Sequence, residues 1–111
     1  GSLTTAFAMS LGLIRREGIA VDAFMDIVRD SALYAPTFDK KLTRMVERNF
    51  ADPNFPTKHL LKDMRLFSEA AIAAGLSPEL ADTVALFAQR AIDQGEADAD
   101  YSALYSAVDP A

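Results

Sequence analysis

Apolar residues return at three- and four-residue steps along almost the whole of this 111-residue chain. No useful stretch alternates in the two-residue period of a β-strand. Because residues three and four apart share one side of a helix, this spacing gives each segment an apolar face. The sequence therefore predicts an all-α fold, a single helical bundle domain of about five to six helices over residues 1–111.

The first segment, Leu3 to Arg16, has so broad an apolar arc that only Thr5, Gly12 and its two arginines mark a polar side. We therefore expect neighbours on more than one side of this helix. The other expected helices run from Val21 to Asp30, through a third after the Ser31–Pro36 turn, from Thr57 to Ala74, from Ser77-Pro78-Glu79 to near Gly95, and over a short last helix capped by Asp100.

The spacing also predicts which large side chains are buried. In the expected second to fifth helices these include Ile27, Val46, Phe67 with Ala74, and Leu80. Ser77 is expected as an N-cap with Pro78 at the first helical position. Arg65 and Glu69 stand at the i,i+4 spacing of a helical ion pair.

Composition excludes several classes of protein and site. The chain has no cysteine and one histidine, His59, so a disulfide, a thiolate nucleophile and a multi-histidine metal site are all excluded. The net charge of -5 argues against nucleic acid as a partner. No apolar run approaches the roughly 20 residues of a membrane span, and nothing directs the chain to secretion, so a cytoplasmic location is expected.

Most enzyme signatures are also missing. The chain has no Gly-rich phosphate loop, no serine in a strand-turn-helix elbow and no second histidine. One residue breaks the helical pattern, because Asp63 falls at the border of the apolar stripe of the Thr57–Ala74 segment. Burying a carboxylate unpaired costs several kcal/mol. Two interpretations are open: Asp63 caps or pairs with a neighbouring helix, or it faces a crevice that holds a ligand.

The residues around Asp63 have structural explanations that compete with functional ones. A surface lysine such as Lys62 is usually only solvated, and His59 is expected to be exposed although it stands one turn before Asp63. Phe55, in a loop flanked by prolines, is more typical of a staple that packs on the first helical turn than of a substrate contact. Tyr101 and Tyr105 are expected to dock the last helix and to have no chemical role.

The run Phe55-Pro-Thr-Lys-His-Leu-Leu-Lys62-Asp63-Met-Arg-Leu-Phe, which continues to Gly75, resembles the Lys-Asp helix of the β-hydroxyacid dehydrogenases. That family includes 3-hydroxyisobutyrate dehydrogenase and tartronate semialdehyde reductase, and it is related to 6-phosphogluconate dehydrogenase. The segments Ser31–Phe38 and Gly95–Leu104 also look like family landmarks. The resemblance covers almost the whole chain and implies the helical C-terminal domain of such an enzyme.

The resemblance implies roles for three residues. Lys62 looks like the lysine that reaches the NAD or NADP cofactor, and Asp63 and Phe55 look like residues on the substrate side of the cleft. The substrate would be a small hydroxy acid or its semialdehyde. The enzyme's own Rossmann domain and a second subunit, in a homodimer or higher homo-oligomer, would be the partners.

The family's catalytic lysine, with an asparagine one turn later, has no counterpart in this chain. The dinucleotide-binding fingerprint is also absent, so the chain is expected to be a domain of a longer protein and inactive alone. Gly1-Ser2 reads equally as a cloning remnant or as a natural helix cap. Two alternatives stay open: a non-catalytic helical module for dimerisation or partner binding, and a free-standing helical regulator. The sequence does not distinguish NAD from NADP.

Overall fold

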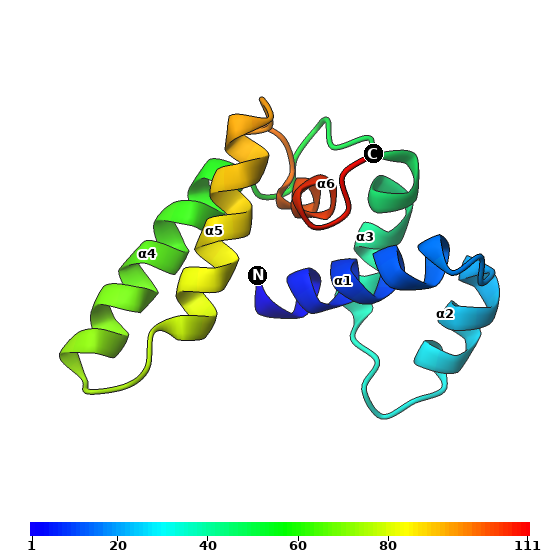
Figure 1. Cartoon of the computed structure of the whole chain (residues 1–111), viewed down its shortest axis with the longest axis horizontal. Coiled ribbons are helices and arrows are strands. Elements are labelled where there is room, and N and C mark those ends of the chain that lie inside the picture. Colours follow the sequence, from blue (N-terminus) through cyan, green and yellow to red (C-terminus); the bar gives the residue numbers. More distant parts are fainter.

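The structure, a computed structural model, describes every residue from Gly1 to Ala111. It contains six α-helices, one 3-10 turn and no β-strand, which confirms the all-α prediction (Figure 1). The elements are α1 (Ser2–Arg16), α2 (Val21–Arg29), α3 (Pro36–Glu47), α4 (Thr57–Ala73), α5 (Glu79–Asp93), η1 (Tyr101–Ala103) and α6 (Leu104–Val108).

Helix α1 crosses the middle of the molecule (Figure 1). The hairpin of α4 and α5 lies on one side of it, and α2 and α3 lie on the other. The short helix α6 sits between these halves and contacts both α1 and α5. Helix α1 also contacts α2, α3 and α5, which confirms that it has neighbours on more than one side.

The two halves have separate apolar clusters. The first cluster joins α1, α2, α3 and α6 through Phe7, Ala8, Leu11, Met25, Met45 and Tyr105. The second joins α4, α5 and α6 through Leu60, Leu61, Val84, Ala88 and Leu104. Each cluster is small, so the elements that connect the two clusters hold the domain together.

Two glycines explain local features of the backbone. Gly75 follows α4 with a φ of 77°, a left-handed conformation that glycine adopts without steric cost. Gly12 lies inside α1, where a Cβ atom would come within 3.2 Å of the Asp109 side chain. The absence of a side chain at Gly12 therefore lets the C-terminal segment lie close against α1.

The prediction of helix faces was wrong at several large side chains. Ile27, Phe67 and Leu80 are 74%, 64% and 66% exposed, and Val46 and Ala74 are also exposed. The buried face of α4 instead includes Leu61 and Ser68, because α4 packs mainly against α5 and exposes the rest of its circumference. A lone amphipathic stripe does not reveal how many neighbours will cover it.

Three polar details also differ from expectation. Thr5 and Gly12 of α1 are buried, because α1 is covered on the side that the sequence marked as polar. The N-cap of α5 is Pro78 rather than Ser77, although the Ser77 hydroxyl still accepts a hydrogen bond from the Glu79 amide at 3.3 Å. Arg65 donates to Gln89 of α5 at 3.2 Å and forms no ion pair with Glu69.

Candidate functional site

The start of α4 is fixed by the segment that precedes η1. The amides of Thr57 and Lys58 donate to the carbonyls of Ala99 and Ala97, at 2.8 and 3.0 Å. The buried Thr57 hydroxyl also donates to the Ala99 carbonyl at 3.0 Å. The first amides of a helix have no partner within it, so these bonds satisfy groups that would otherwise need water or a side-chain cap. The first turn of α4 is therefore held firmly in place.

Lys62 and Asp63 both lie on exposed parts of α4, and neither side chain forms a hydrogen bond or an ion pair within the chain. The interpretation that Asp63 caps or pairs with a neighbouring helix is therefore wrong, and none of the surface hollows of this chain is lined by Asp63. Asp63 avoids the cost of burial by staying in solvent. Two adjacent residues on a helix point about 100° apart, so Lys62 and Asp63 offer a cation and an anion in different directions.

Phe55 is half-buried against the second cluster, as expected for a staple at the start of α4. Its ring meets the Tyr101 ring edge-on, with 6.1 Å between ring centroids, and lies 6.0 Å from the His59 ring. His59 is exposed, as expected, and forms no hydrogen bond with Asp63. Phe55 and His59 are therefore in contact at the same end of α4 that carries Lys62 and Asp63.

The three predicted site residues do not share a cavity. None of the five hollows on the surface is lined by Phe55, Lys62 or Asp63. No group of three or more histidine, aspartate or glutamate side chains is placed to hold a metal ion, and no helix is long and apolar enough to cross a membrane. If these three residues act on a ligand, another domain has to supply the opposite wall.

A buried ion pair between Lys41 and Asp100 was missed by sequence reasoning. Lys41 of α3 is only 2% exposed, and its Nζ atom lies 2.9 Å from Oδ2 of the fully buried Asp100. Burial raises the pKa of Asp100, but hydrogen bonds from Ser102 and Lys41 lower it by more, to about 2. The sequence carried a signal, because Lys41 stands three residues after Phe38 and four before Met45, on the apolar side of α3.

The capping role expected of Asp100 is confirmed. Its Oδ2 atom accepts a hydrogen bond from the Ser102 amide at 3.0 Å, at the start of η1. Tyr105 is fully buried in the first cluster, and its hydroxyl donates to Asp109 at 2.9 Å and accepts from Arg15 at 3.0 Å. Tyr101 and Tyr105 thus dock the last helices, as expected.

Residues 2–108 match the family described as NAD-binding of NADP-dependent 3-hydroxyisobutyrate dehydrogenase. The chain belongs to this family. That membership confirms the resemblance inferred from the Lys-Asp helix and makes NAD(P) the cofactor class of the family.

Two curated relatives from Arabidopsis thaliana support the assignment. The chain is 35% identical to glyoxylate/succinic semialdehyde reductase 1 and 29% identical to the chloroplastic glyoxylate/succinic semialdehyde reductase 2. Each match covers 97% of this chain. The chain spans only 37% and 30% of the length of these relatives.

A solved structure shows the same fold. The 3-hydroxyisobutyrate dehydrogenase of Salmonella typhimurium superposes with a TM-score of 0.84 at 25% identity. The match covers 96% of this chain and 37% of that enzyme. The helical bundle is thus the fold of one part of a dehydrogenase in this family.

Proposed function

We propose that this chain is the C-terminal substrate-binding and dimerisation domain of an NAD(P)-dependent 3-hydroxy acid dehydrogenase, inactive alone. The parent enzyme would resemble 3-hydroxyisobutyrate dehydrogenase or tartronate semialdehyde reductase, and a Rossmann domain outside residues 1–111 would complete it. The names of the Arabidopsis relatives favour a small acid aldehyde, such as glyoxylate or succinic semialdehyde, as the substrate to reduce. A cytoplasmic location remains a prediction, which imaging of the tagged full-length protein would test.

The observation that carries the proposal is the free state of Lys62 and Asp63 on an exposed part of α4. An exposed ammonium group without a carboxylate partner suits an anionic cofactor, whereas a free carboxylate suits a hydroxyl or amide donor. The chain fits only part of a dinucleotide site, because it has no Gly-rich loop for the pyrophosphate. That cradle has to come from the other domain.

In this mechanism the nicotinamide cofactor supplies the hydride when it is bound. Lys62 fastens the cofactor from the side of the helical domain. Asp63 orients the substrate or the polar groups beside it, and Phe55 walls the substrate side and excludes water. The general acid that would give a proton to the carbonyl oxygen of the substrate, and so form the hydroxyl group, lies outside this chain. These residues therefore bind and position, which is catalysis through orientation.

A crossed pair of substitutions tests the two charged residues in the full-length enzyme. Lys62→Ala should raise the KM for NADPH or NADH about tenfold and leave the KM for the aldehyde within about twofold, because only cofactor binding is weakened. Asp63→Asn should raise the KM for the aldehyde about tenfold and leave the KM for NADPH or NADH within about twofold. Steady-state kinetics with glyoxylate and succinic semialdehyde measure both constants. Lys40→Ala removes an exposed lysine of α3 as the control. Unchanged constants in both variants would refute the assignment.

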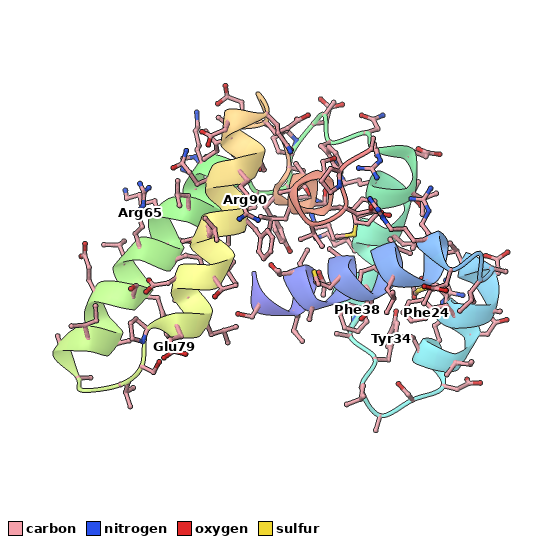
Figure 2. All side chains as sticks on the ribbon, in the orientation of Figure 1. Phe24, Tyr34, Phe38, Arg65, Glu79 and Arg90 are labelled. Carbon is pink, nitrogen blue, oxygen red and sulfur yellow. The ribbon has the colours of Figure 1, made fainter.

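The dimerisation part of the proposal rests on an apolar groove between α1 and α2. Its volume is about 420 Å³, and it is lined by Leu3, Ala6, Phe7, Ser10, Phe24, Ile27, Val28, Ser31, Leu33 and Phe38. Phe24 and Phe38 lie against Phe7 of α1, with ring centroids 6.3 and 4.8 Å apart (Figure 2). A patch of this kind often marks a protein interface.

A charge in the groove should separate the subunits. Ile27→Lys should shift the full-length protein from dimer or higher oligomer toward monomer, because a lysine in an apolar interface core is left without a partner. Ile27 is 74% exposed, so the fold should tolerate the change. Leu76→Lys, on a residue 66% exposed and outside the groove, is the matched control. Light scattering that finds both variants as large as the wild type would contradict the groove as the interface.

The same groove supports the second candidate function, a helical platform without catalysis. The two candidates differ in cofactor use. A full-length protein that dimerises through the groove but shows no saturable binding of NADPH or NADH would favour the platform.

A further inference from the structure

The buried carboxylate of Asp100 accepts hydrogen bonds from four residues. Lys41 Nζ lies 3.0 and 2.9 Å from its two oxygens, and the amide and hydroxyl of Ser102 lie 3.0 and 2.6 Å from Oδ2. The remaining donors are backbone amides of the loop before α4: Asn54 at 3.0 Å and Phe55 at 3.4 Å, both to Oδ1. One buried anion therefore joins α3, η1 and the loop that carries Phe55.

The ring of Phe55 is reached by the same cluster. Lys41 Nζ lies 4.6 Å from the centroid of the Tyr101 ring, a cation-π distance. The Tyr101 ring in turn meets Phe55 edge-on, and the Tyr101 amide donates to the Phe55 carbonyl at 2.9 Å. Asp100 thus holds the backbone of Phe55 directly, and Lys41 contacts the Phe55 side chain through the Tyr101 ring.

The loop before α4 has other hydrogen bonds at its start, where Arg44 of α3 donates to the carbonyls of Ala51 and Asp52 at 2.5 and 2.8 Å. It belongs to no helix, and its partner is the segment before η1, which pairs with it at an isolated bridge between Pro56 and Asp100. The backbone bonds of this pairing are 2.8–3.0 Å long and join Thr57 to Ala99, Lys58 to Ala97, Asp100 to Phe50 and Tyr101 to Phe55. At Asn54 and Phe55 the amides have only the Asp100 carboxylate as a hydrogen-bond acceptor.

We propose that Lys41 and Asp100 are positioning residues for the substrate wall, acting through Phe55. The inference rests on the proposed function, in which Phe55 lines the substrate side of the cleft. Neither Lys41 nor Asp100 reaches solvent or a cavity, so neither can touch a ligand directly. Their ion pair holds the Asp100 carboxylate where the loop amides need an acceptor, and the loop holds the ring.

A charge-free replacement of the pair separates positioning from folding. Lys41→Met together with Asp100→Leu removes both charges at similar volume, a change that buried ion pairs often tolerate. It leaves the Asn54 and Phe55 amides without an acceptor. In the full-length protein these two amides should exchange hydrogen at least about tenfold faster, because their protection depends on the carboxylate. The Thr57 amide, bonded to the Ala99 carbonyl, should keep its protection and so report an intact fold.

The functional readout is a double-mutant cycle with Phe55→Ala in the full-length enzyme. The charge-free pair should raise the KM for the aldehyde substrate about tenfold with kcat little changed, as expected when uniform binding is lost. In the Phe55→Ala background the same pair should raise that KM no more than about twofold, because the two changes act on one contact. Arg29→Met with Asp39→Leu removes an exposed ion pair between α2 and α3 and should leave the KM unchanged.

Each outcome decides a different step. Wild-type exchange at Asn54 and Phe55 overturns the role of the carboxylate, and additive effects on KM overturn the route through Phe55. If Phe55→Ala leaves KM unchanged, the proposed substrate role of Phe55 falls, and the functional part of the inference falls with it. Ser102→Ala removes one 2.6 Å hydrogen bond and keeps the ion pair. It should show the same faster exchange to a smaller degree, and it replaces the double variant if that protein does not fold.

Discussion

Replacing Lys41 alone by methionine should destabilise the domain by about 3–5 kcal/mol, because it leaves the Asp100 carboxylate buried without its cation. Asp100 is fully buried and Lys41 is 2% exposed, so water cannot replace the lost partner. A domain of ordinary stability unfolds at a cost of about 5–15 kcal/mol. The variant should therefore lose a large part of its stability, and urea denaturation followed by circular dichroism should show a clearly lower midpoint than in the wild type.

The double variant, Lys41→Met with Asp100→Leu, is the control for this prediction. It should recover part of the lost stability, because removing both charges also removes the cost of desolvating them, whereas the amides of Ser102, Asn54 and Phe55 still lack their acceptor. If Lys41→Met alone loses less than about 1 kcal/mol, the pair behaves like a surface ion pair and the structural role assigned to it is wrong.

The same pair has a distinct dependence on pH. The folded-state pKa of Asp100 is about 2, below the ordinary 3.8, so its stabilising effect is complete above pH 4 and is lost as the pH falls toward 2. A shift of this size corresponds to about 2 kcal/mol. Without Lys41, the pKa of Asp100 should be higher than in the wild type, because burial still raises it and the hydrogen bond from Lys41 no longer lowers it. Protonation of the carboxyl group should then remove the unpaired buried charge that destabilises the variant. The stability difference between wild type and Lys41→Met should therefore narrow as the pH falls from 5 to 2.

The course of the chain was predictable from the sequence because helix periodicity and helix ends are local features. The order of the helices, the loop before α4 and the cap at Asp100 all follow from residues within a few positions of one another. The exposure of Ile27 and Phe67 was not predictable, because it depends on which neighbours cover each helix. A stripe of apolar residues fixes a face, but it does not fix the width that is buried.

Long-range polar contacts were beyond the same reasoning. Lys41 and Asp100 are 59 residues apart, and a lysine in an apolar stripe is normally explained as one that extends to solvent. For Asp63 the opposite error was made. Its place at the edge of an apolar stripe suggested a partner on a neighbouring helix, but its side chain is exposed and has no partner within the chain. The roles of Lys62, Asp63 and Phe55 came from a family resemblance, and their site needs a wall that these residues do not supply.

Helix α6 shows how neighbouring residues can hold two cores together. Leu104 and Tyr105 are both fully buried, yet Leu104 belongs to the α4–α5 cluster and Tyr105 to the α1–α3 cluster. The helix has only five residues, too few to be stable by itself. It is held by the two clusters, and it holds them to each other.

Replacing Leu104 by alanine should therefore cost about 2–5 kcal/mol and loosen one half of the domain more than the other. The substitution leaves a cavity among Leu60, Val84 and Ala88, so the hairpin of α4 and α5 loses its packing contact with α6. Amide exchange should accelerate more in α4 and α5 than in α1 and α3, because the hairpin can open while the first cluster stays packed.

Leu76→Ala, at a residue 66% exposed, is the matched control and should change stability by no more than about 0.5 kcal/mol. Equal acceleration of exchange in both halves would mean that the domain unfolds as one unit and that the two clusters are not separable. Preferential loosening of the hairpin would instead locate the weak point in the half that contains α4, the helix that carries Lys62 and Asp63. The site residues would then stand on the half of the domain most able to move against a partner domain.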